Sequence, residues 1–99
     1  MLERRREVQL YMEIEQLDNI AIVTVKERMN ILNAPVLIRE MNRLLDRGAK
    51  HFIVDLSSVR VLDADGDYPL LHLLKRVQEH DGRGRVVLIC PPNNPVRLL

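Results

Sequence analysis

The sequence predicts a single small α/β domain in which a mixed, mostly parallel sheet packs against helices. Three observations support this prediction. The chain has 99 residues, which is enough for one hydrophobic core but not for two. Its composition, 46% hydrophobic and 29% charged, is that of a globular protein. Strand-like and helix-like segments follow one another in the order β-β-α-β-α-β-(α), and such alternation is typical of parallel strands joined by helices.

The first two strands are predicted to form a hairpin that follows a charged lead-in over residues 1–10. Residues 11–15 alternate apolar and acidic side chains, which is the period of a strand with one buried face. The Asp-Asn pair at 18–19 favours a turn, because these side chains bond nearby backbone and tolerate left-handed geometry. Residues 20–25 are almost wholly apolar and largely β-branched, which suits a strand covered on both faces. We therefore expect the domain to span residues 11–99.

The first helix is predicted to begin at Asn33 and to end near Gly48. The side-chain oxygen of Asn33 is expected to accept a hydrogen bond from the first turn. Pro35 suits that turn because its missing N–H has no partner there. Gly48 favours the conformation that ends a helix. The expected buried stripe has helical spacing and consists of Leu37, Met41, Leu44 and Leu45. The side chains expected to face away from it are Arg39, Glu40, Asn42 and Arg43.

Two further strands, over residues 51–56 and 85–90, are expected on either side of a second helix that follows Asp65-Gly66. The apolar stripe predicted for this helix consists of Leu70, Leu71, Leu74 and Val77. Its expected outward side chains are His72, Lys75, Arg76 and Glu79. Residues 94–99 provide the first turn of a last helix, so we expect that helix to be shortened. Apolar surface left uncovered by a short last helix would favour a homo-oligomer.

Charge and composition argue against several classes of function. Fifteen Lys and Arg against fourteen Asp and Glu give a net charge of +1, whereas a nucleic-acid-binding protein normally carries a clear basic excess. Three aromatic residues are too few for a base-stacking platform. The single cysteine cannot form an internal disulfide, and the three histidines are scattered, so no metal or other cofactor is expected. The longest apolar run is five residues, far below the roughly 20 of a membrane helix, so we expect a cytoplasmic protein without membrane insertion.

Three carboxylates at alternate positions, Asp63, Asp65 and Asp67, stand just before the second helix. The simplest interpretation is structural, because Asp65 can cap the helix and Asp67 can complement its dipole, each contributing up to about 1 kcal/mol. A calcium loop of the EF-hand type is excluded, because Tyr68 and Leu74 stand where that loop needs Gly and Glu. An apolar run followed by Asp-x-Asp-Gly resembles the nucleophile motif of haloacid-dehalogenase-type phosphatases. That resemblance implies, as an alternative, a small Mg²⁺-dependent phosphohydrolase that uses Asp63 and Asp65.

Four segments of the chain occur in an order that is typical of one known family. Residues 27–35 (Glu-Arg-Met-Asn-Ile-Leu-Asn-Ala-Pro) combine a turn with a Pro at the first helix. Residues 55–57 (Asp-Leu-Ser) end a strand, and residues 62–66 (Leu-Asp-Ala-Asp-Gly) form the loop before the second helix. Residues 95–99 (Pro-Val-Arg-Leu-Leu) follow the last strand. Together these segments resemble a STAS domain, the family of bacterial anti-sigma-factor antagonists, and the resemblance covers residues 12–99, nearly the whole chain.

This resemblance implies a non-enzymatic module that binds a protein partner, namely an anti-sigma factor with serine-kinase character. The partner-binding residues that it implies are Arg28, Asn30, Asp63, Ala64, Asp65, Gly66, Asp67 and Tyr68. Family members are phosphorylated on a Ser or Thr at the position that Ala64 and Asp65 occupy here. Neither residue has a hydroxyl, so we expect no phosphorylation switch in this loop. A role as a scaffold subunit of a larger signalling or transport complex is the other alternative that the family offers.

Overall fold

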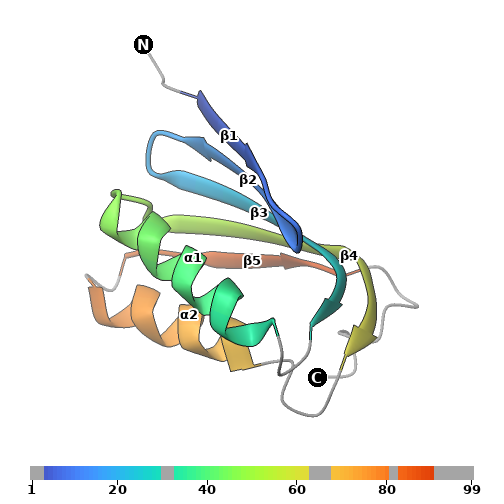
Figure 1. The fold of residues 1–99 in the computed structure, drawn as a ribbon. Coiled ribbons are helices and arrows are strands. Elements are labelled where there is room, and N and C mark those ends of the chain that lie inside the picture. The colour runs from blue at the N-terminus through green and yellow to red at the C-terminus, as the bar shows by residue number, and fades with distance from the viewer. Residues whose placement is uncertain (1–3, 30–32, 63–67, 81–82, 91–99) are drawn as a thin grey trace.

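A computed structural model describes residues 4–29, 33–62, 68–80 and 83–90 (Figure 1). These residues form five strands and two helices, so the order β-β-α-β-α-β expected from residue 11 onward is confirmed. One more strand precedes them. The shortened last helix expected over residues 94–99 lies outside the described residues. The elements are β1 (Arg4–Val8), β2 (Met12–Leu17), β3 (Ile20–Met29), α1 (Ala34–Asp46), β4 (His51–Leu62), α2 (Tyr68–His80) and β5 (Val86–Ile89).

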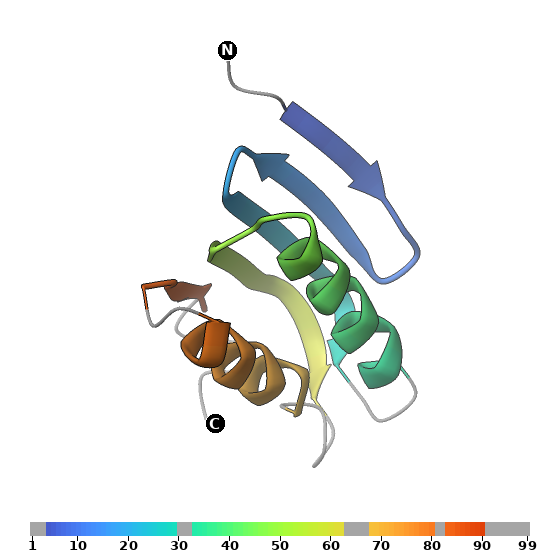
Figure 2. The ribbon, with the colours of Figure 1, turned by 90° about the vertical axis from the view of Figure 1, so that its left-hand side faces the viewer.

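The strands form one sheet in the order β1-β2-β3-β4-β5, so each strand pairs with its neighbours in the sequence. The pairs β1/β2 and β2/β3 are antiparallel, and the pairs β3/β4 and β4/β5 are parallel. Both crossover helices lie on the same face of the sheet (Figure 2), as two right-handed crossovers in the same direction require. The predicted mixed sheet with packed helices is confirmed. Because β1 adds a second antiparallel pair, the described sheet has two parallel and two antiparallel pairs and is not mostly parallel.

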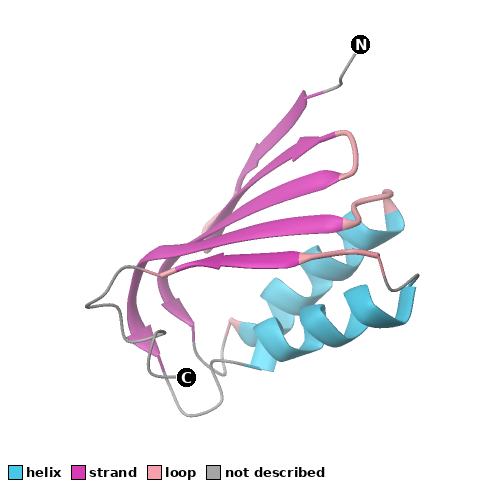
Figure 3. Cartoon of the chain, turned by 180° about the vertical axis from the view of Figure 1, so that it is seen from behind, coloured by secondary structure: helices cyan, strands magenta, loops and turns pink. Residues whose placement is uncertain are grey.

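The core lies between this face of the sheet and the two helices (Figure 3). Alternate residues of the strands point into it, among them Val23, Phe52 and Val54, all fully buried. Leu37 and Met41 of α1 enter from the other side. The opposite face of the sheet carries no described helix, and we call it the open face. Among the described residues, no helix is long and apolar enough to cross a membrane.

Two predictions about α1 are wrong in detail. Asn33 precedes the helix, but its side chain makes no capping hydrogen bond; its amide instead donates to the Arg28 carbonyl oxygen at 2.7 Å. Asn33 therefore ties the start of α1 to the end of β3. Glu40, expected to face away, is only 7% exposed. It accepts a hydrogen bond from Arg43 Nε at 2.7 Å, and this charge pairing makes its burial tolerable.

The end of α1 follows the sequence prediction. Gly48 has φ +96°, the left-handed conformation that favours glycine. The Gly48 N–H donates to the Leu45 carbonyl at 3.1 Å, and the Ala49 N–H donates to the Leu44 carbonyl at 3.0 Å. These two bonds define a Schellman motif, and Leu44 and Ala49 are both buried in the core.

The buried stripe of α2 differs from the prediction. Leu70, Leu73 and Val77 are buried, and Leu73 is fully so. Leu71 and Leu74, which were predicted to be in the stripe, are 59% and 43% exposed. The segment contains two adjacent leucine pairs, so helical periodicity fits more than one face, and contact with the core decides between them.

Residues 4–8, part of the expected lead-in, form the edge strand β1. This strand is attached to the helical layer as well as to β2. The Glu7 carboxylate accepts hydrogen bonds from Arg43 Nη2 at 2.5 Å and from Arg47 Nη1 at 3.1 Å, both on α1. On the open face, Arg4 pairs with Glu15, and Arg6 lies 3.9 Å from Glu13. The charges that suggested a solvated lead-in therefore pair with specific partners on β2 and α1.

Candidate functional site

The carboxyl ends of β3 and β4 lie side by side in the sheet. The two strands run parallel, and their last paired residues are Met29 and Leu62. Helix α1 begins at Ala34 and α2 at Tyr68, and both helices begin at this end of the sheet (Figure 1). Ligands and partners of α/β sheets usually bind at such strand ends.

Two of the eight predicted partner-binding residues are described, and both belong to this end of the sheet. Arg28 is an exposed residue of β3, and Tyr68 is the first residue of α2. The other six lie outside the described residues: Asn30, Asp63, Ala64, Asp65, Gly66 and Asp67. The prediction for them therefore stays a prediction. The same holds for the alternative chemistry of Asp63 and Asp65.

Strand β4 continues six residues past its predicted end, through residues that were assigned to the loop. Its pairing with β3 shifts register twice, between Thr24 and Lys26 and between Glu27 and Arg28. At each shift β4 has one residue more than β3, so both irregularities are bulges in β4. Bulges turn side chains away from strict alternation. As a result Ser57, Ser58 and Arg60 are all exposed, while Val59 between them stays buried.

The opposite stretch of β3 has an unusual backbone conformation. Glu27 has φ +60°, a left-handed value that costs about 1 kcal/mol or more in a residue other than glycine. It lies between the two register shifts. Such outliers are concentrated at functional sites.

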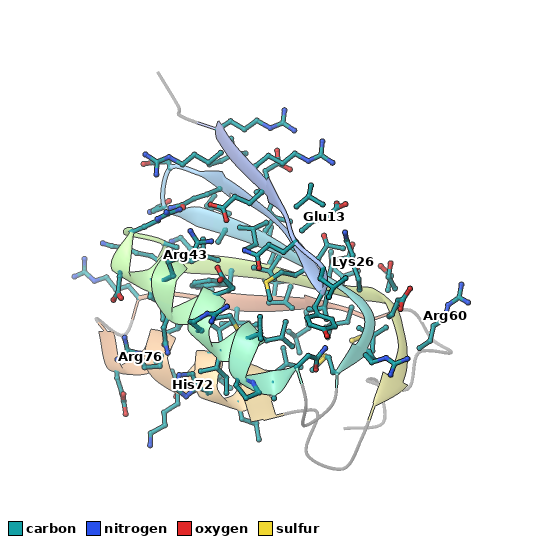
Figure 4. All side chains as sticks on the ribbon, viewed as in Figure 1. Glu13, Lys26, Arg43, Arg60, His72 and Arg76 are labelled. Carbon is teal, nitrogen blue, oxygen red and sulfur yellow. The ribbon has the colours of Figure 1, made fainter. Side chains whose placement is uncertain are left out.

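These irregular stretches of β3 and β4 enclose a groove on the open face of about 740 Å³. We call it the open-face groove. It is lined by Glu13, Thr24, Lys26, Glu27, Arg28, Ser57, Ser58 and Arg60. Figure 4 shows Glu13 and Lys26 close together over the strands, and Arg60 extending outward from β4. Lys26 Nζ lies 3.5 Å from Glu13 Oε1 and donates to the Gln9 carbonyl oxygen at 3.4 Å.

Sequence reasoning did not find this groove. Ser57 was recognised within a family motif and, with Ser58, as a turn hydroxyl that could accept a phosphoryl group, whereas Lys26 and Arg60 were not singled out. Alternation along the hairpin could have placed Glu13 and Lys26 on one face. The two bulges in β4 leave no comparable signal in the sequence, because they depend on how two strands pair. Ser57 also bonds locally, since its N–H donates to Asp55 Oδ1 at 2.9 Å and its hydroxyl donates to the same oxygen.

Among the described residues, a polar contact joins α1 to α2. His72 Nε2 lies 3.2 Å from Asn42 Oδ1. His72 was expected to be an outward residue, but it is half-buried at the seam between the two helices (Figure 4). Its contact is structural and lies on the face of the sheet opposite to the open-face groove.

Residues 11–99 match the family profile described as the STAS domain. This match covers most of the chain, and the fold described above agrees with it. The chain therefore belongs to the STAS domain family. No curated protein sequence matches the chain.

Several solved structures share this fold. The anti-sigma factor antagonist SpoIIAA in its unphosphorylated form has a TM-score of 0.67 at 9% identity, covering 98% of this chain and 81% of SpoIIAA. The protein TM1081 has a TM-score of 0.72 at 20% identity, with 96% and 74% covered. An anti-sigma factor antagonist from Mycobacterium paratuberculosis has a TM-score of 0.56 at 22% identity, with 99% and 77% covered. The structure of Mglu has a TM-score of 0.68 at 18% identity, and the match covers 82% of this chain but only 20% of Mglu.

Proposed function

We propose that this chain is a non-enzymatic regulatory module that binds a protein partner at the carboxyl ends of β3 and β4. The observation that carries the proposal is the parallel β3/β4 pair, whose strands end side by side at Met29 and Leu62 and lead into α1 and α2. Membership of the STAS domain family supports it, as do two structural neighbours that are anti-sigma factor antagonists.

The proposed docking residues are Arg28 on β3, Asn30 after that strand, residues 63–67, and Tyr68 at the start of α2. Arg28 is exposed, so a partner can reach it without any rearrangement of the core. By analogy with the antagonists, the partner is a protein of the anti-sigma-factor type.

In this proposal the loop before α2 holds one binding state. Phosphorylation would add a charge of about −1.5 to −2 to a docking surface and thereby change its affinity for the partner. Ala64 and Asp65 have no hydroxyl to accept a phosphoryl group. Asp65 supplies a fixed charge of about −1 instead.

The docking surface is tested by binding. The partner is captured with the tagged chain, identified, purified, and titrated calorimetrically against the variants Arg28→Glu and Asp65→Lys. Each variant should weaken binding by about tenfold or more, equivalent to ~1.4 kcal/mol. Arg85→Glu is the matched control, because Arg85 is also exposed but precedes β5, at the opposite end of the parallel strands. Equal losses in all three variants, or no loss in any, would contradict the proposed surface.

The absent switch is tested separately. The chain and its variant Asp65→Ser are incubated with ATP and a kinase of the anti-sigma-factor type, and phosphorylated peptides are mapped by mass spectrometry. We expect phosphate only in the variant, on the serine introduced at position 65. Phosphate on Ser57 or Ser58 of the unaltered chain would show that phosphorylation still acts on this protein.

A further inference from the structure

Strand β1 lies at the edge of the sheet and, among the described strands, pairs with β2 alone (Figure 1). It contributes no side chain to the hydrophobic core, whose first described member is Met12. The residues of β1 are exposed except for Glu7, which is half-buried. β1 also lies before residues 11–99, the segment that matches the STAS domain profile. The described core is therefore built without β1, and a different strand can take the same place beside β2.

Backbone pairing and ion pairs hold β1 in this place. Its five residues pair antiparallel with β2. On the open face, Arg4 pairs with Glu15, and Arg6 Nη2 lies 3.9 Å from Glu13 Oε2. Exposed ion pairs contribute little to stability, because water and salt screen them. An edge strand held in this way can open while the rest of the domain stays folded.

The edge of β2 that β1 covers has opposite charges on its two faces. Glu13 and Glu15 lie on the open face, and Arg43 and Arg47 of α1 reach the other face, where they donate to Glu7. Successive side chains of a strand alternate between the two faces of a sheet. A strand that fits this edge therefore carries basic side chains toward the open face and an acidic side chain toward α1. The opposite pattern would bring like charges together on both faces.

We propose that the β2 edge is a strand-acceptor site, which β1 fills within the chain and which an extended segment of a partner protein can occupy in its place. The segment that fits has the charge pattern of residues 4–7, with basic residues at its first and third positions and an acidic residue at its fourth. Backbone hydrogen bonds add the segment to the sheet, and the charges select its sequence. This site uses the edge of the sheet rather than the carboxyl ends of β3 and β4, so it goes beyond the proposed function and does not require it.

β1 competes with such a partner. Only residues 9–11 join β1 to β2, so the tethered strand is present at a high effective concentration. The partner binds only chains in which β1 has opened, and its apparent affinity falls with the fraction of such chains. Loosening β1 should therefore strengthen the binding of a matching strand.

The first experiment measures whether β1 opens on its own. Amide hydrogen exchange is followed in the full chain and in Glu7→Lys, which reverses the charge that faces α1. Amides of residues 4–8 should exchange at least about tenfold faster in the variant, while those of β3 and β4 keep their protection. Arg6→Glu reverses a charge on the open face and should have the same effect, so it replaces Glu7→Lys if that variant does not fold. Arg85→Glu, which reverses an exposed charge before β5, should leave β1 as protected as in the unaltered chain.

The second experiment measures the binding of a matching strand. A fluorescent peptide with the sequence of residues 3–10 is titrated against the full chain and against Glu7→Lys, and its anisotropy is recorded. The peptide should bind Glu7→Lys at least about tenfold more tightly than it binds the unaltered chain. NMR shifts in the ¹⁵N-labelled variant should centre on residues 12–17. The control peptide exchanges the residues at positions 6 and 7, which keeps the composition but puts both charges on the wrong faces. It should bind at least about tenfold more weakly.

Four results would overturn the acceptor site. The first is a β1 that stays protected in both charge-reversed variants. The second is an absence of saturable peptide binding to the folded variant. The third is equal binding of the two peptides, and the fourth is equal affinity of the matching peptide for the unaltered chain and for Glu7→Lys, because either shows that the peptide binds elsewhere. Glu7 is not among the proposed docking residues, so these measurements succeed or fail independently of the proposed function.

Discussion

Glu7 shows how one side chain can fix an added strand to a helix. Its hydrogen bond with Arg43, supported by Arg47, lowers the pKa of the Glu7 carboxyl from 4.5 to about 2, against the opposing effect of burial. The same hydrogen bond raises the pKa of the Arg43 guanidinium. Because Arg43 also bonds the buried Glu40, this cluster links β1 to the part of α1 that contacts the core.

The Glu7 pair predicts a pH dependence of stability. The folded carboxyl has the lower pKa, so its stabilisation is complete above about pH 4.5 and is lost as the pH falls toward 2. The Glu7 side chain is 34% exposed, so solvent screening reduces the contribution to about 1 kcal/mol. Glu7→Gln should destabilise the chain by this amount at pH 7. Between pH 4.5 and 2, the melting temperature of this variant should depend less on pH than that of the unaltered chain. Glu15→Gln, which removes one ion pair with the exposed Arg4, should change stability by less than about 0.5 kcal/mol. Equal effects of the two variants would disprove this role of Glu7.

Gly84 and Gly48 are required for different reasons. A Cβ at Gly84 would overlap the Lys50 carbonyl oxygen and Val77 Cγ1. A Cβ at Gly48 would lie in open space, but the backbone there is left-handed, a conformation that side chains disfavour. We expect Gly84→Ala to cost about 1–3 kcal/mol from overpacking and Gly48→Ala to cost about 1 kcal/mol from backbone strain. Urea unfolding measures both free energies. A Gly84→Ala chain as stable as the unaltered one would show that no close approach exists there.

At the scale of elements, α2 shows where sequence periodicity stops being informative. Its helical character and start could be predicted, but the leucine pairs at 70–71 and 73–74 left its orientation undetermined. Packing selects Leu73, which is fully buried, over Leu71, which is 59% exposed. Contact with the sheet is a property of the whole fold, so no local pattern contains it.

The orientation of α2 predicts a large difference between two nearby truncations. Leu73→Ala should cost about 2–5 kcal/mol, because it leaves a cavity in the core. Leu71→Ala should change stability by less than about 0.5 kcal/mol. Urea unfolding of the two variants makes the comparison, and a larger loss for Leu71→Ala would favour the stripe that the sequence suggested.

The strands show the same limit. The apolar segments at 20–25 and 51–56 predicted β3 and β4, because continuous β-branched residues are a strong local signal. Their extensions to Met29 and Leu62 contain charged and hydroxyl residues, and β1 is mostly charged, so composition suggested loops. These residues are strands because neighbouring strands offer them backbone hydrogen bonds. The open-face groove depends on these extensions, so it could not be predicted from local composition either. The docking residues could be proposed from the sequence because they belong to short motifs.

At the scale of the whole molecule, the two edges of the sheet differ in chemistry. The β1 edge contains Arg4, Arg5 and Arg6, and charges of this kind discourage pairing with another sheet. The β5 edge has only apolar residues, of which Val87, Leu88 and Ile89 are 53%, 46% and 44% exposed. An uncharged apolar edge is prone to self-association.

This asymmetry predicts concentration-dependent self-association through β5. Sedimentation velocity should show larger species as the chain is concentrated, and Val87→Lys should reduce them. Val8→Lys places the same charge on the β1 edge, where Val8 is 63% exposed, and should leave them unchanged. A chain that stays monomeric at high concentration, or equal effects of the two lysines, would show that β5 is not the contact.

The strictly sequential order of the sheet has a consequence for how the protein is made. Every strand pairs with the strand synthesised just before it, so no strand has to wait for a distant segment. Each parallel pairing closes only the loop that contains one helix, which keeps the entropy lost on closure small. During synthesis, β2 meets β1, β3 meets β2, and each crossover helix covers strands that already exist. The sheet can therefore grow in one direction as the chain leaves the ribosome, and β5 is the last of the described strands to be added.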